Sequence, residues 1–120
     1  MSWNPYDNLP PAASFSLTSS DLREGEKLAM PQVSGIFGAG DESGSGLPQG
    51  AFQLPNDARM ARYCGAGPPP GHGRHRYIFA VLALEAPRIE IDREATPAWL
   101  MFNLFTGTLG RAFLEGWYER

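Results

Sequence analysis

The sequence predicts a small, mostly β protein, an antiparallel sandwich-like sheet with one helix near the C-terminal end. Fourteen glycines and eleven prolines among 120 residues favour short strands joined by turns over a helical bundle. Residues Tyr77–Leu84 form an unbroken apolar run of strand length, and Thr96 followed by proline is a typical helix start. A chain of this length suits one domain.

The elements expected in the first half follow an extended N-terminal arm. Residues 1–14 carry three prolines and no periodicity, and residues 15–120 form the single domain. The stretch Ser14–Thr18 alternates apolar and polar side chains, which predicts a half-buried strand. The stretch Lys27–Ile36 is expected to hold a short edge strand, because Pro31 cannot donate to a sheet ladder.

The elements expected in the second half surround the apolar run. A short strand is predicted at Ala51–Leu54, closed by turn residues. Because Tyr77–Leu84 is apolar on both faces, we expect it at the centre of the sheet. A helix is predicted from Thr96 to Gly110, and Ala112–Tyr118 follows as a closing strand. The helix carries an apolar stripe that we expect to pack in the core, made of Leu100, Met101, Leu104, Phe105 and Leu109.

Charge and cysteine content exclude several classes of protein. The net charge is −3 and no basic stripe is present, so a nucleic-acid partner is not expected. The single cysteine, Cys64, excludes an intrachain disulfide and fits a reduced, cytoplasmic setting. The first residues, MSWNPYDNLPPAASF, lack the basic and apolar segments of a secretory signal, and no apolar run is long enough to predict a membrane span.

The loop before the apolar run, CGAGPPPGHGRHRY, carries the chemistry. Its glycines let the backbone approach a ligand, and the consecutive prolines 68–70 stiffen it. His75 and Tyr77 are two residues apart at the start of a strand, so they share one face of the sheet. Both side chains can donate to an anion, and the Gly67 amide lies nearby in the sequence. Together Gly67, His75 and Tyr77 would suit a phosphate or a carboxylate.

Three other interpretations of this loop stay open. It is a plain turn if its polar groups hydrogen-bond only within the protein. A metal site would need His72 and His75 to be joined by Cys64 or Asp57, although a zinc site requires three or four ligands of matched geometry. A Cys64–His72 nucleophile pair would need a feature that lowers the thiol pKa, and the sequence shows none.

At Gly65–Tyr77 the chain resembles the phosphatidylethanolamine-binding protein family, in its bacterial Raf kinase inhibitor-like (YbhB/YbcL) branch. The block GAGPPPGHGRHRY is similar to the family's second signature, G-x-x-P-P-x-G-x-x-H-R-Y. FSLTSSDLREGEKLAMPQVSG and TPAWLMFNLFTGTLGRAFLEGWYER resemble the family's N-terminal and closing segments. The resemblance implies a non-enzymatic protein without cofactor or metal that binds a small phosphorylated or anionic headgroup. The residues it implies for the pocket are Gly67, His75 and Tyr77, with Pro68 and Pro69 as its wall.

The chain departs from the family at the glycine-rich stretch 38–50, GAGDESGSGLPQG. The family's central block, a D-P-D-A-P motif followed by a strand with H-W, is expected there and is absent from the sequence. A deletion junction near 38–50 implies half a pocket and weak binding. It also implies exposed strand edges, which invite a homodimer or a domain swap. The alternative is a protein-interaction module that inhibits a kinase or a protease, or a truncated remnant that binds nothing.

Overall fold

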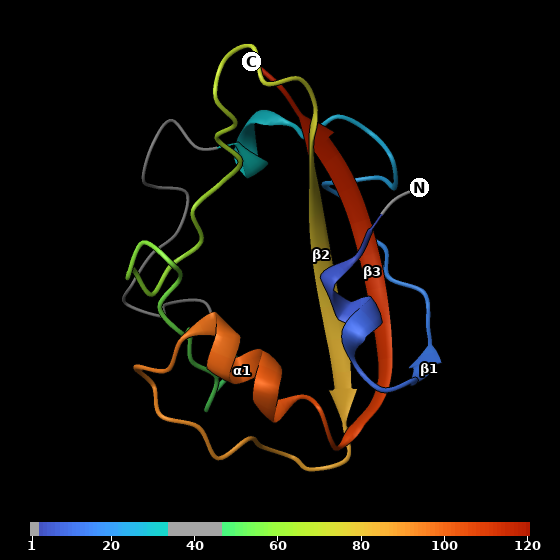
Figure 1. Ribbon diagram of the computed structural model, residues 1–120, viewed down its shortest axis with the longest axis vertical. Helices are drawn as coiled ribbons and strands as arrows, with labels where there is room; N and C mark the ends of the chain where they lie inside the picture. Colours follow the sequence, from blue (N-terminus) through green and yellow to red (C-terminus); the bar gives the residue numbers. More distant parts are fainter. Residues whose placement is uncertain (1–2, 34–46) are drawn as a thin grey trace.

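Two long antiparallel strands, β2 (His75–Leu84) and β3 (Thr108–Tyr118), form the frame of the molecule. The computed structural model describes residues 3–33 and 47–120. The short strand β1 (Ala13–Ser14) pairs in parallel with the other edge of β3, so the sheet is mixed and its order is β1-β3-β2 (Figure 1). The remaining elements are the 3-10 helices Pro5–Asn8 and Met30–Gln32 and the α-helix α1, Pro97–Asn103.

The core lies on the face of the sheet to which Leu114 of β3 belongs. Leu114 on β3 packs with Leu22 and Leu28 from the N-terminal half and with Ala66 from the loop before β2, and all four are buried. Gly116 makes this packing possible, because a Cβ there would stand 2.5 Å from Leu28 Cδ2 and 2.9 Å from Leu22 Cδ1. The absence of a side chain therefore lets the two leucines lie directly on β3.

The opposite face is covered by the N-terminal arm. The Tyr6 ring packs on Phe113 with centroids 5.4 Å apart. The Arg111 guanidinium donates to the carbonyls of Tyr6 and Pro10, and Arg76 donates to the Trp3 carbonyl at 2.7 Å. The arm is therefore fixed by side chains that point away from the core, and one turn of 3-10 helix interrupts the extended backbone expected there.

The N-terminal half of the chain contributes less strand to the sheet than the sequence predicts. Strand β1 ends at Ser14, so only the first residue of the region expected to form the strand Ser14–Thr18 lies in a strand. Instead of an edge strand at Lys27–Ile36, the described part holds two isolated bridges, at Lys27 and Val33, separated by a 3-10 turn. The predicted strand Ala51–Leu54 is not part of any strand of the described sheet. Local alternation alone therefore does not make a ladder.

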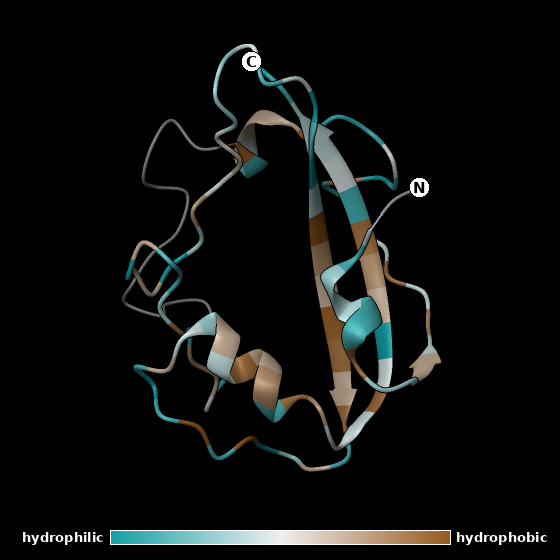
Figure 2. Cartoon of the chain, viewed as in Figure 1, coloured by the Kyte–Doolittle hydropathy of each residue, from teal (hydrophilic) through white to brown (hydrophobic). Residues whose placement is uncertain are grey.

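The central position of the apolar run is a second correction. Within the described chain β2 pairs only with β3, so β3 is the central strand and β2 lies at the edge. Its side chains are half-buried or exposed, and Val81 remains 45% exposed. Continuous apolar sequence therefore leaves much apolar surface on β2, as Figure 2 shows by its hydrophobic colouring.

Helix α1 begins where the sequence predicts and ends early. The Thr96 hydroxyl accepts a hydrogen bond from the Trp99 amide at 3.1 Å, which caps the first turn. The helix stops at Asn103 instead of Gly110, because Gly107, with φ of 81°, turns the chain and β3 begins at the next residue. The expected core stripe is also wrong, since only Leu104 of its five residues is buried.

We expect Gly116→Val to destabilise the protein by about 1–3 kcal/mol, because the added atoms overlap the buried Leu22 and Leu28 side chains. Chemical denaturation measures the loss as a lower transition midpoint. The exposed β2 position Ala83 supplies a matched control, and Ala83→Val should change stability by less than about 0.5 kcal/mol. Equal stability of the two variants would contradict the close packing at Gly116.

Candidate functional site

The loop at residues 64–74 is fastened to the fold at both ends. At its start, Ala66 bridges Val33, and its amide donates to the Gln32 carbonyl at 3.0 Å. At its far end the Gly71 amide donates to the Arg120 carbonyl at 3.1 Å. Gly71, with φ of 80°, adopts the left-handed conformation that the turn back toward β2 requires. The loop is thus held between a core residue and the end of β3.

The five predicted site residues divide between this loop and β2. Pro68 is fully buried and anchors the loop, whereas Gly67 and Pro69 lie at the surface. His75 and Tyr77 lie on one face of β2, opposite Tyr118 and Gly116 of β3, and both are half-buried. The common face predicted for His75 and Tyr77 is confirmed by this register.

Tyr77 links the loop to the strand. Burial raises the pKa of its phenol, while the Gly67 backbone and the Arg120 charge lower it. A backbone hydrogen bond that lowers the pKa of a phenol is donated by an N–H group, so the Gly67 amide is the group that faces the Tyr77 oxygen. The structure therefore brings together two of the predicted residues, Gly67 and Tyr77, across the loop-to-strand junction.

Arg120 belongs to the same neighbourhood, and sequence reasoning missed it. Its Nη2 atom lies 3.9 Å from the point where a Cβ on Gly67 would stand. A signal existed in the sequence. Once β2 and the closing strand are paired with His75 opposite Tyr118, the chain beyond Tyr118 must lie beside the loop that precedes His75.

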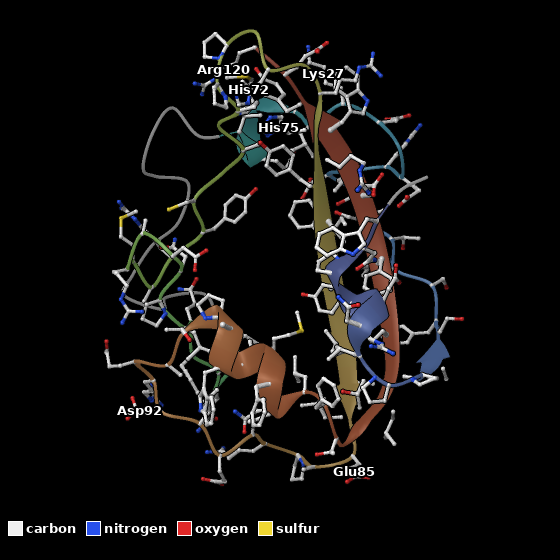
Figure 3. The ribbon with its side chains drawn as sticks, in the orientation of Figure 1. Lys27, His72, His75, Glu85, Asp92 and Arg120 are labelled. Carbon is white, nitrogen blue, oxygen red and sulfur yellow. The ribbon has the colours of Figure 1, made fainter. Side chains whose placement is uncertain are left out.

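The two histidines approach each other at the end of the sheet. The His72 and His75 rings lie with centroids 5.5 Å apart, and Figure 3 shows both near Arg120. Over residues 3–33 and 47–120, no group of three or more His, Cys, Asp or Glu side chains is placed to hold a metal ion. The Cys64 sulfur instead accepts a hydrogen bond from Asn56 Nδ2 at 3.1 Å.

Further cations lie close to the aromatic end of β3. The Arg74 guanidinium stacks over the Trp117 ring at 3.7 Å and pairs with Glu119 at 3.8 Å. The Lys27 ammonium lies 5.7 Å from the same ring and 5.4 Å from the Tyr118 ring. These charges are directed at rings and a carboxylate, so they contribute a positive field near the loop without touching Gly67.

Two surface cavities lie away from the predicted site. One of about 880 Å³ is bounded by residues 49–52, 54–56 and 87–91 and by the start of α1. The other, of about 260 Å³, lies between the N-terminal arm and β3 beside Arg111. Neither is lined by any of the five predicted residues, of which Gly67 and Pro69 are exposed. In the part of the chain described, no helix is long and apolar enough to span a membrane.

Comparison with known proteins agrees with the sheet and the loop. The family model of phosphatidylethanolamine-binding protein matches residues 8–119. UPF0098 protein YbhB of Escherichia coli K12 is 40% identical over 79 residues, which cover 63% of this chain and 49% of YbhB. UPF0098 protein YbcL of the same strain is 36% identical over 81 residues, which cover 68% of this chain and 44% of YbcL. The chain thus spans about half the length of the curated relatives it matches.

A solved structure supports the fold. The crystal structure of E. coli YbcL, described as a new member of the mammalian PEBP family, matches with a TM-score of 0.77 at 23% identity. The match covers 86% of this chain and 96% of the solved chain. The mostly β class with a minor helix, predicted from the sequence, is therefore confirmed.

We expect Arg120→Ala to raise the Tyr77 pKa further, because it removes a positive charge that favours the phenolate. A pH titration followed by NMR of ¹³Cζ-labelled tyrosine resolves Tyr77, which should ionise above 10.0 in the unmodified chain. Since the folded-state pKa exceeds the unfolded one, Tyr77 makes stability fall as the pH rises from about 10 through the folded-state pKa. Arg74→Ala is the control, and a Tyr77 pKa that responds equally to both variants would contradict the Arg120 contact.

Proposed function

Because the chain belongs to the phosphatidylethanolamine-binding protein family, we propose that it is a non-enzymatic protein that binds a small phosphorylated or anionic headgroup. The binding groups are the Gly67 amide, the His75 imidazole and the Tyr77 hydroxyl. The observation that supports this most directly is the meeting of Gly67 and Tyr77 where the loop joins β2. All three groups can donate hydrogen bonds, which suits an anion and not a cation.

The loop is preorganised for ligand binding. Buried Pro68 and the Gly71–Arg120 hydrogen bond fix its two ends, so little backbone freedom is lost on binding. The Tyr77 phenol is protonated at neutral pH, as any tyrosine is, and burial raises its pKa further, so its proton is available to an acceptor. Exposed Pro69 supplies an apolar wall beside Gly67.

We expect the binding to be weak. The chain covers about half the length of its curated relatives, and the D-P-D-A-P and H-W motifs that would supply an aspartate and a second histidine do not occur in it. Three donors on an open surface correspond to dissociation constants from about 0.1 mM to several mM, or roughly −5 to −3 kcal/mol. A cytoplasmic location and a deletion junction near 38–50, which lies mostly outside the described residues, stay predictions.

Inhibition of a kinase or a protease is the alternative activity. It would act through a protein surface, and tight binding to a partner together with indifference to phosphate would favour it. No contact in the described residues singles out such a surface, so headgroup binding is the better supported function.

Self-association is the second part of the proposal, and the open edge of β2 supports it. Within the described chain β2 pairs on one side only, and its residues Tyr77–Leu84 include neither charge nor proline. Such an edge is a template for another strand. Antiparallel pairing of β2 with β2 of a second copy places the same apolar sequence on both sides of a two-fold axis.

We expect His75→Ala to weaken the binding of O-phosphorylethanolamine. The imidazole is one of three donors, and loss of one from a weak site lowers affinity by about fivefold to tenfold. Two-dimensional amide NMR measures the shifts at Gly67 and Tyr77 during titration. His72→Ala removes an exposed imidazole 5.5 Å away and should leave the affinity within about twofold. Unchanged binding by His75→Ala would remove His75 from the site.

We expect the chain to form a dimer that Val81→Lys weakens by about tenfold or more, since a lysine on an edge strand opposes strand addition. Light scattering during size-exclusion chromatography gives the mass at each concentration. Leu109→Lys, at a 57% exposed position on β3, is the matched control and should leave the mass unchanged. A monomer at all concentrations, or equal effects of both lysines, would contradict pairing through β2.

A further inference from the structure

We infer that Arg120 is the charged ligand contact of the candidate site and makes it select a doubly charged phosphate monoester over a carboxylate. The inference rests on the proposed function, because it concerns the same site at Gly67 and Tyr77. It adds a residue that neither the motif in the loop nor the strand pattern indicates. It also names the class of ligand the site distinguishes.

The position of Arg120 is set by the backbone on both sides of the site. Its carbonyl accepts the Gly71 hydrogen bond at 3.1 Å, which ties the end of β3 to the loop. Its Nη2 atom lies 3.9 Å from the Cβ position of Gly67, and its charge acts on the Tyr77 phenol. Figure 3 shows Arg120 beside His72 and His75 at this end of the molecule. The guanidinium therefore lies over the same backbone that the proposed ligand must approach.

Glycine at position 67 is part of this arrangement. Because Gly67 has no side chain, it leaves room for oxygen atoms of a ligand to approach its amide and the neighbouring guanidinium together. In the ligand-free chain the Gly67 amide faces the neutral Tyr77 oxygen. An anionic oxygen is a stronger acceptor and would replace it, so that Tyr77 donates to the ligand as well.

The chemistry of arginine decides the ligand class. A guanidinium is always charged and presents a planar fork of N–H groups that fits two oxygens of a phosphate or a carboxylate. A phosphate monoester near pH 7 carries up to two charges on three oxygens. Two of its oxygens can accept from the Arg120 guanidinium while the third accepts from Gly67 and Tyr77. A carboxylate has only two oxygens, and both are engaged when it binds the guanidinium. The other cations nearby, Arg74 and Lys27, lie over aromatic rings.

The test compares three probes on four forms of the full chain. Inorganic phosphate, O-phosphorylethanolamine and acetate are titrated by amide NMR into the unmodified chain and into Arg120→Ala, Arg120→Lys and Arg74→Ala. Arg120→Ala leaves the backbone carbonyl that holds Gly71, so the loop keeps its hydrogen bond. Arg74→Ala is matched, because it removes an arginine at the same end of the molecule that stacks on Trp117 instead of meeting Gly67.

We expect Arg120→Ala to weaken both phosphate probes about tenfold or more and to bring their affinities to within about threefold of that of acetate, since a hydrogen bond to a charged group is the stronger kind. The affinity of Arg120→Lys for phosphate should lie between those of the unmodified chain and Arg120→Ala, because lysine keeps the charge and loses the planar fork of N–H groups. Arg74→Ala should bind within about twofold of the unmodified chain. Dispersed spectra of all four forms show that each is folded.

The outcomes separate this inference from the proposed function. If the unmodified chain binds phosphate and Arg120→Ala binds it equally, Arg120 is not a ligand contact and the proposed function stands. If Arg74→Ala loses as much affinity as Arg120→Ala, a general positive field explains the binding and the inference is overturned. If no probe shifts Gly67 or Tyr77 in the unmodified chain, the proposed function fails and the inference fails with it.

Discussion

The pairing of β2 with β3 is the interaction on which the rest of the structure depends. Its register places Gly116 opposite Tyr77, and only a glycine there lets Leu22 and Leu28 close over the sheet. Because side chains alternate along a strand, a slip of one residue would turn Glu115 toward the leucines and Leu114 away from them. The same register carries the end of β3 to the loop at Gly67. Core packing and site geometry are therefore fixed by one ladder.

The sequence predicted the elements that local signals define and failed where long-range pairing decides. Thr96 and its following proline gave the helix start, and the apolar run gave β2, because both signals lie within a few residues. The central position of β2 was wrong, since an apolar run shows that burial is favoured but not which strands are present to provide it. For the same reason the strand predicted near Ser14 is shorter than expected, and the one predicted at Ala51–Leu54 is not part of the described sheet. The turn at Gly107 prevents the helix from continuing to Gly110, although the apolar residues up to Leu109 follow helical spacing.

The site was predicted in part for similar reasons. Gly67, His75 and Tyr77 belong to one continuous segment, so motif and strand alternation were enough to group them. Pro68, predicted to form the pocket wall with Pro69, is fully buried, which the sequence did not indicate because burial depends on what packs against the loop from outside its own sequence. Arg120 was missed because it is 53 positions from Gly67 in the numbering of the chain and only the β2–β3 ladder brings it back.

The candidate site obtains its charge from a distant part of the sequence. The loop and β2 provide a backbone amide and a phenol that is neutral near pH 7, and neutral donors alone compete poorly with water for an anion. The strand ladder places a permanent charge next to them by extending β3 past the loop. Within residues 3–33 and 47–120 the other edge of β2 is open, so pairing with a second copy would stiffen the strand that carries His75 and Tyr77. Ligand binding and self-association would then be coupled, because each favours the same ordered β2.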